Sequence, residues 1–158
     1  MTHMYLHYTH PDNVDDILTY GLQVGRPPVL GKEVEWVLGH YDENPVYLTM
    51  HDSDFITAFL EEAWEGYVPF EVNAMDLPLA ADIPSLIDMG ARFYEGSLDL
   101  RGQDVFTPLL QFADEYGFIE IEHLVDPTTD AAKEAMKITR TATCLVSVPQ
   151  TRLKILPI

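Results

Sequence analysis

Basic residues are scarce in this sequence. Its 158 residues include nine lysines and arginines against 26 aspartates and glutamates, so the formal net charge at pH 7 is -17. Proteins bind nucleic acids and anionic lipids largely through lysine and arginine contacts to phosphate. We therefore expect no direct binding to nucleic acid or to a membrane. Solubility alone is the simplest interpretation of this charge, but it also favours a basic protein partner, which an acidic surface attracts at low salt.

Cysteine is nearly absent, because Cys144 is the only one in the chain. This excludes an intrachain disulfide, and a lone thiol favours a reducing compartment. No apolar run reaches the roughly 20 residues needed to span a bilayer. The first ten residues, MTHMYLHYTH, do not contain a basic region followed by an apolar one, as a signal peptide would. We expect a cytoplasmic protein.

Several motifs of catalysis and cofactor binding are also missing. The chain has no Walker loop, no Gly-x-Gly-x-x-Gly and no Gly-x-Ser-x-Gly elbow. One cysteine cannot build a thiolate site, and the histidines lack the spacing of zinc ligands. No metal is therefore expected at these histidines, which are His3, His7, His10, His40, His51 and His123.

The patterns that are present predict one domain over residues 1–158 with an α+β fold. Alternating apolar residues predict strands over residues 4–8, 46–49, 68–72, 118–122, 143–148 and 151–156. Helical spacing predicts helices over residues 12–20, from 52 or 53 to 63, 83–89, from 103 or 104 to just before Gly117, and 130–136. The late strands follow one another without helices between them, which predicts an antiparallel or mixed sheet. The long connection over residues 23–44 is expected to cover a ligand or contact a target.

Three segments in order carry the functional signal. YLHYT at residues 5–9 leads into NVDDILTYGL, VYLT occupies residues 46–49, and YGFIEIE at 116–122 precedes CLVSVPQTRLKI. This order resembles the ADP-ribosyltransferase family of the His-Tyr-Glu type. That group includes diphtheria-toxin-like and poly(ADP-ribose) polymerase-like domains and small bacterial and phage members such as anti-CRISPR ADP-ribosyltransferases. The first segment lacks the glycine of the family's Leu-Tyr-His-Gly-Thr motif.

The resemblance implies an ADP-ribosyltransferase-like fold and NAD as substrate. His7 matches the histidine that hydrogen-bonds the adenosine-side ribose, and Thr9 would help to shape the nicotinamide pocket. Tyr47 matches the tyrosine whose ring stacks on nicotinamide, a flat cation that an aromatic face suits. Each residue alone has a simpler interpretation as an ordinary residue of a sheet.

The third member of the pattern is different here. The family places a catalytic glutamate near the position of Thr143, which cannot supply a carboxylate. Breaking the nicotinamide bond makes a cationic sugar, and a carboxylate stabilises that charge. Glu120 and Glu122 are two residues apart on a predicted strand and would share a face. One of them is the candidate replacement, although a solvated strand face of an acidic protein is an equal interpretation.

The pyrophosphate of NAD would need a cationic partner in so acidic a chain. The sequence offers Arg26, Lys32, Arg92 and Arg101 and does not choose among them.

The leading prediction is therefore transfer of ADP-ribose from NAD to a macromolecular acceptor, protein rather than nucleic acid. An alternative is a protein that keeps the fold without catalysis and inhibits a basic nucleic-acid-binding partner, as the missing late glutamate favours. A third is an NAD-using RNA phosphotransferase, which would need several arginines on one face. The small size fits a bacterial or phage conflict protein by association.

Overall fold

The computed structural model describes residues 4–25, 41, 45–50, 66–94, 96–101 and 107–156. Within these ranges the chain forms two antiparallel sheets and several short helices, so the predicted α+β class is confirmed. The predicted helix ending at residue 63, Arg26, Lys32 and most of the 23–44 connection lie outside the described residues. No helix in the described part of the chain is long and apolar enough to cross a membrane.

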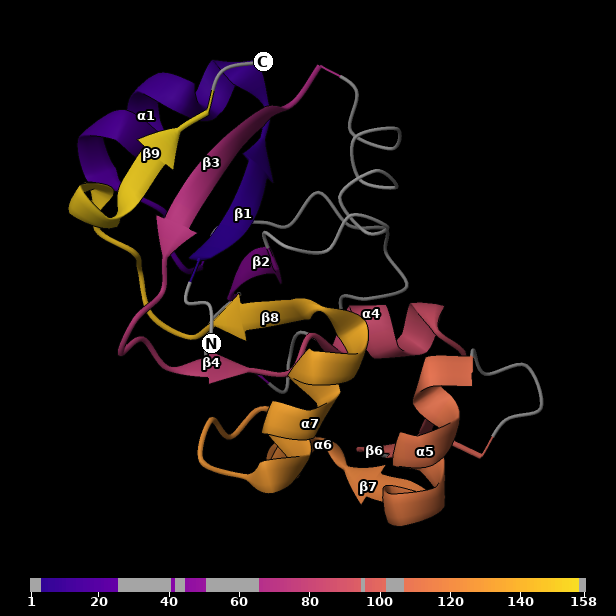
Figure 1. Cartoon of the computed structure of the whole chain (residues 1–158). Coiled ribbons are helices and arrows are strands. Elements are labelled where there is room, and N and C mark those ends of the chain that lie inside the picture. The colour runs from indigo at the N-terminus through magenta and orange to yellow at the C-terminus, as the bar shows by residue number, and fades with distance from the viewer. Residues whose placement is uncertain are drawn as a thin grey trace.

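Six strands build the larger sheet, in the order β4-β8-β2-β1-β3-β9 with every neighbouring pair antiparallel (Figure 1). They are β1 (Met4–Thr9), β2 (Val46–Met50), β3 (Val68–Asn73), β4 (Leu79–Ala80), β8 (Thr141–Cys144) and β9 (Leu153–Ile155). The first three match the predicted strands closely. The predicted strand over residues 143–148 is wrong in its bounds, because β8 begins and ends earlier. The last predicted strand begins as the 3-10 turn η3 (Gln150–Arg152).

Helix α1 (Val14–Tyr20) packs against this sheet after the turn η1 (Pro11–Asn13), and it ends at Gly21 as predicted. Gly21 has a φ of 78°, in the left-handed region that glycine adopts without strain. A Cβ at this position would lie 2.1 Å from the carbonyl oxygen of Val148. The next residue, Leu22, forms a backbone bridge with Val148. Glycine is therefore required where the end of α1 approaches the chain's last segment.

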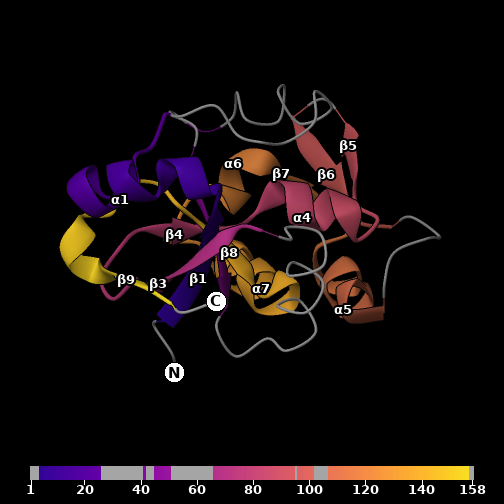
Figure 2. The ribbon, with the colours of Figure 1, turned by 90° about the horizontal axis from the view of Figure 1, so that it is seen from above.

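A three-stranded sheet, β5-β6-β7, and four helices form the rest of the described chain. The strands are β5 (Arg92–Tyr94), β6 (Ser97–Asp99) and β7 (Phe118–Glu120). The helices are α4 (Ile83–Asp88), α5 (Thr107–Tyr116), α6 (Ile121–Leu124) and α7 (Asp130–Thr139). Figure 2 shows α1 on one side of the molecule and α5, β5 and β6 on the other.

The predicted strand over residues 118–122 is wrong beyond Glu120, where α6 begins. The amide of Ile121 donates to the carbonyl of Gly96 at 2.9 Å, and the amide of Val125 then donates back to Ile121 at 3.0 Å. Ile121 and Leu124 are both fully buried. Their spacing of three residues suits one face of a helix and not one face of a strand.

Two hydrophobic cores lie on either side of β2. The α1 core contains Val46 and Leu48, together with Ile17 from α1. The helical core gathers buried residues of α4 to α7 and the second sheet, and Tyr47 packs against it. Successive residues of a strand point to opposite faces, so Tyr47 stands on the opposite face of β2 from its two neighbours.

Candidate functional site

The pairing between β1 and β2 is short. Only Tyr5 with Met50 and Leu6 with Thr49 pair across it, although β1 pairs with β3 along its whole length. Beyond Leu6, the imidazole of His7 connects the two strands in place of a main-chain hydrogen bond. Its Nδ1 lies 2.8 Å from the main-chain oxygen of Tyr47. The structure thus brings together the first two predicted site residues, 40 positions apart in the chain, where the strand pairing stops.

This bond fixes the protonation of the histidine. A carbonyl oxygen can only accept, so Nδ1 of His7 carries the proton and donates. Burial lowers the pKa of His7, and the bond to Tyr47 offsets only part of that effect. The ring is therefore neutral near pH 7, and its Nε2 has a lone pair. That nitrogen can accept a hydrogen bond from a hydroxyl group, such as that of a ribose.

Tyr47 combines a partly accessible ring with a buried hydroxyl. The hydroxyl oxygen has no hydrogen-bond partner within the described part of the chain, and such groups are rare in folded proteins. Burial raises the pKa of Tyr47, and the neighbouring Tyr41 and Asp82 raise it further. The phenol therefore stays neutral. Its aromatic ring packs against the helical core and is partly buried.

Thr9 lies two residues beyond His7 and is buried near the end of β1, opposite Val68 of β3. Residues two apart on a strand point to the same side. The structure therefore places Thr9 and His7 on one side of β1. Tyr5 lies on that side and pairs with Met50, so it is the side of Val46 and Leu48 on β2, opposite the side of the Tyr47 ring.

Thr143 stands directly opposite Tyr47 in the pairing of β8 with β2. It is fully buried, and its hydroxyl lies 3.2 Å from the main-chain oxygens of both Ala80 and Ala81. Thr143 occupies the position where the resemblance expects a glutamate. Its side chain instead contacts the main chain where β4 is followed by α4.

Asp82 is the residue that the sequence reasoning missed. Among the carboxylates whose burial the structure describes, it alone is buried, with 6% of its surface exposed. It caps α4, since its two oxygens accept from the amide of Ser85 at 3.2 Å and from the Ser85 hydroxyl at 2.7 Å. Beside it the Tyr41 hydroxyl donates to the carbonyl of Ala81 at 2.7 Å. Asp82 followed by Pro84 and Ser85 is a recognisable cap signature, but only the tertiary structure reveals its burial.

Glu120 and Glu122 lie together but apart from His7 and Tyr47. Glu120 ends β7 and Glu122 belongs to α6, and both are exposed. Ligand atoms of these two glutamates and His123 lie within 4.8 Å of one another. Exposed acidic groups are common without a metal ion, so this spacing alone defines no site. Figure 1 shows β7 at the opposite end of the molecule from β1.

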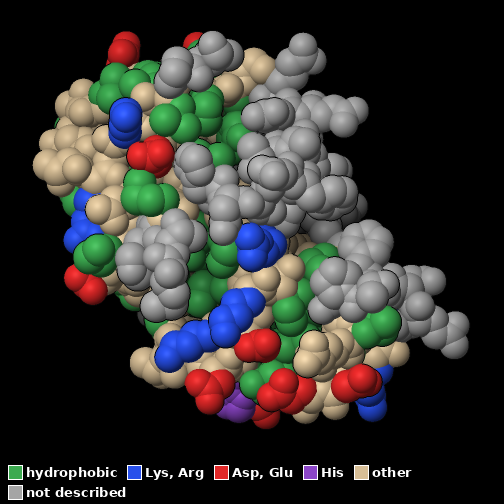
Figure 3. Space-filling view, viewed as in Figure 1, with side chains coloured by type: hydrophobic (Ala, Val, Ile, Leu, Met, Phe, Trp, Pro, Cys, Tyr) green, Lys and Arg blue, Asp and Glu red, His purple; other side chains and the backbone are tan. Residues whose placement is uncertain are grey.

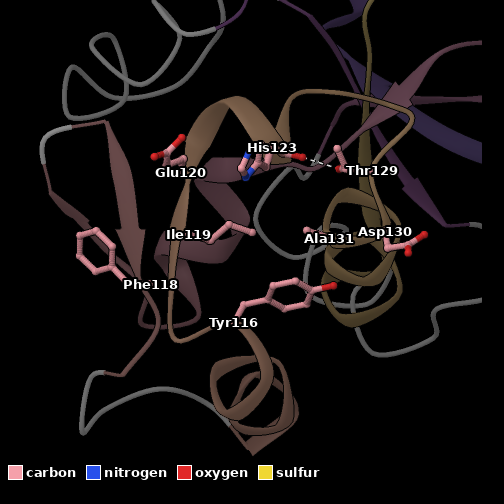
Figure 4. Close-up of a pocket in the computed structure, with 8 residues that line it drawn as sticks. All are labelled: Tyr116, Phe118, Ile119, Glu120, His123, Thr129, Asp130 and Ala131. Atoms are coloured by element: carbon pink, nitrogen blue, oxygen red, sulfur yellow. Dashed lines mark hydrogen bonds between the residues drawn. The ribbon is translucent and has the colours of Figure 1, made fainter.

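A shallow pocket of about 570 Å³ lies beside these glutamates, and neither His7 nor Tyr47 lines it. Figure 4 shows Tyr116, Ile119 and Ala131 around the space between β7 and α7. The carboxylate of Glu120 projects from the other side of β7. Glu120, His123, Thr129 and Asp130 also line the pocket, so its wall mixes polar and apolar side chains.

The described candidates for holding pyrophosphate lie on the second sheet or just after it. Arg92 is exposed on β5. Arg101 pairs with Asp99 at 2.9 Å and lies 5.7 Å from the ring centre of Phe118. The structure brings neither arginine to His7.

Acidic residues are spread along the sequence, with nine and no basic residue over residues 33–65, and within the described part of the chain the last two segments differ. Residues 107–139 contain seven acidic and two basic residues, whereas residues 141–156 contain two basic residues and no acidic one. Figure 3 shows acidic side chains gathered at the lower end of the molecule, over α5 and α7.

No protein-family model matches the chain, and no curated protein and no solved structure matches it.

Proposed function

We propose that this protein is an NAD-dependent ADP-ribosyltransferase with an ADP-ribosyltransferase-like fold and a protein acceptor. The observation that carries the proposal is the 2.8 Å bond from the His7 ring to the main chain of Tyr47. Two residues that the family resemblance pairs in one NAD site are adjacent, and each has the chemistry that its role requires.

In this proposal the Nε2 atom of His7 accepts a hydrogen bond from the adenosine-side ribose at the edge between β1 and β2, and nicotinamide stacks on Tyr47. The bond between nicotinamide and its ribose then breaks. Its electrons stay with the nicotinamide nitrogen, and positive charge develops on the sugar. A nucleophile of the acceptor forms the new bond to the sugar carbon and loses its proton. Holding the reactants in place can supply much of the acceleration.

Glu120 and Glu122 were the predicted charge-stabilising carboxylates, and in this structure they stand at the acidic end of the molecule. We assign them to contact with the basic surface of the acceptor. Because they are exposed, such contacts would govern the rate of association more than the affinity.

The binding-protein alternative is supported by Thr143, which is fully buried where the resemblance expects a glutamate. If catalysis has been lost, the acidic end over residues 107–139 would carry the function by binding a basic nucleic-acid-binding partner. The two proposals differ in one respect, because only the first requires NAD.

Calorimetric titration with NAD separates the two functions. We expect binding by the wild type, loss of at least about tenfold in affinity in Tyr47→Ala, and a loss of about tenfold in His7→Asn. His10→Asn is the matched control. His10 is an exposed histidine that caps η1 by accepting from the amide of Asp12 at 3.1 Å, and asparagine keeps that capacity.

No heat of binding at millimolar NAD would sink the transferase proposal, and capture of a basic partner would then be the next measurement. Equal loss in His7→Asn and His10→Asn would show that the histidine at position 7 has no special role.

A further inference from the structure

A row of paired residues leads from the Tyr47 ring to Asp82. Tyr47 pairs with Thr143 across β2 and β8, and Thr143 pairs with Ala80 across β8 and β4. Neighbouring strands are about 4.8 Å apart, and directly paired side chains point to the same face of a sheet. Asp82 follows Ala80 by two residues, at the point where β4 gives way to α4. The carboxylate therefore lies at the end of the row that contains the proposed nicotinamide platform.

The carboxyl group of Asp82 is held within the fold. Its oxygens accept two hydrogen bonds from Ser85, which favour the ionised form. Its charge reaches both tyrosines of the site, because it contributes to the raised pKa of Tyr41 and of Tyr47. Charges interact more strongly in such a partly buried setting than in water. A charged ligand on Tyr47 would therefore interact electrostatically with the Asp82 carboxylate.

We propose that Asp82 makes the Tyr47 site selective for a flat cation, so that it takes the oxidised pyridinium form of nicotinamide and rejects the neutral reduced form. This inference rests on the proposed function, which places nicotinamide on Tyr47. The aromatic face and the carboxylate act in the same direction, since both attract a positively charged ring. Asp82 is thus a specificity-determining residue.

The same charge continues to act after the substrate has bound. When the bond to nicotinamide breaks, positive charge moves from the pyridinium ring to the sugar carbon. A carboxylate fixed in a buried position need not reorganise as that charge moves. Asp82 thereby fills the role for which the sequence alone offered Glu120 or Glu122.

The test compares ligands that differ by one positive charge. Affinities for NAD and NADH, and for 1-methylnicotinamide and nicotinamide, are measured by calorimetry or by ligand-observed NMR. The wild type is expected to favour each cation by about tenfold or more. Asp82→Asn and Asp82→Ser, which both keep a residue that caps helices, should bring both ratios close to one. The neutral ligands should bind as before, within about twofold.

Asp114→Asn is the control for net charge, because it removes an exposed carboxylate from α5. It should leave the ratios unchanged. A wild-type ratio near one overturns the inference, and so does a cation preference that survives in a folded Asp82 variant. If the wild type binds neither NAD nor nicotinamide, the proposed function fails instead. The two failures are therefore distinguishable.

Discussion

The two sheets hold their ionisable groups in opposite ways. At the edge between β1 and β2, the pKa of His7 is lowered and that of Tyr47 is raised, in both cases chiefly by burial. At the end of β7, Glu120 and Glu122 face solvent. Groups whose pKa values are shifted by burial and by named neighbours are characteristic of sites that bind or react. Exposed carboxylates contribute mainly to the field around the molecule.

In the proposed function, the chemistry belongs to the first sheet and contact with the acceptor to the second. The sequence pattern grouped His7 and Tyr47 with Glu120 or Glu122, but the fold places the glutamates in a different part of the molecule. Two glutamates at alternate positions, such as Glu120 and Glu122, form a recognisable sequence pattern. A single aspartate at the start of a helix, such as Asp82, does not.

The largest expected effect is on the scaffold of the first sheet. Gly21→Ala adds a Cβ that would lie 2.1 Å from the Val148 oxygen, at a φ of 78°. We expect a loss of about 2–4 kcal/mol in the free energy of unfolding, measured with urea. Gly25→Ala is the matched control, since Gly25 has a φ of 83° but no atom within 4 Å of the added Cβ. It should cost about 1 kcal/mol, and equal losses in the two variants would contradict the role given to the Val148 contact.

The next effect is a pH dependence that arises from the buried His7 of the first sheet. The pKa of His7 in the folded protein lies below the 6.5 of an ordinary histidine, so the unfolded chain takes up the proton first as the pH falls. The contribution of His7 to the free energy of unfolding is therefore fully present above pH 6.5. It is lost progressively as the pH falls from 6.5 to the pKa of His7 in the folded protein. The slope is at most about 1.4 kcal/mol per pH unit.

Urea midpoints at a series of pH values would measure this, with His7→Gln losing that part of the dependence. His10→Asn, on an exposed side chain, should keep it. A pH profile unchanged by His7→Gln would show that the histidine is not held neutral by the fold.

A smaller effect is expected where the resemblance places its glutamate. Thr143→Val keeps the shape of a fully buried side chain and removes a hydroxyl that lies 3.2 Å from two main-chain oxygens. The loss should be about 1 kcal/mol in stability, with affinity for NAD unchanged within about twofold. A large fall in nicotinamide release from the folded variant would instead make Thr143 part of the chemistry.

The smallest effect on stability and on NAD binding is expected from the second sheet. Replacing both Glu120 and Glu122 by glutamine should change the free energy of unfolding by less than about 0.5 kcal/mol and leave NAD affinity unchanged. Transfer to a basic protein should slow, and most clearly at low salt. If nicotinamide release without an acceptor fell about a hundredfold, the sequence-based assignment of these glutamates to catalysis would be right and the division between the sheets would be wrong.

The sequence predicted those elements of the fold whose structure is determined by residues near one another in the chain. The helix ending at Gly21 and the strands of β1, β2 and β3 follow from apolar spacing and a glycine stop. The strands β4, β5 and β6 were missed, because two or three residues carry no readable period. The α6 helix was missed because its two buried residues only acquire a common face through the bond from Ile121 to Gly96.

The candidate site likewise contains residues that the sequence predicted and one that it did not. His7 and Tyr47 were predicted from motifs and lie together in the fold. The position of Asp82 depends on which strands pair, since it reaches Tyr47 through β4 and β8 and not through nearness in sequence. Pairing between strands distant in sequence is set by the tertiary fold and is poorly encoded in a local pattern.

The contact that orients His7 is made to a main-chain oxygen of residue 47, an atom that every amino acid possesses. The histidine's orientation is therefore independent of which side chain occupies that position. A tryptophan or phenylalanine there could change the ligand's platform while the imidazole keeps its tautomer. The two halves of the site can thus be altered one at a time, by evolution or by an engineer, without both being lost in a single step.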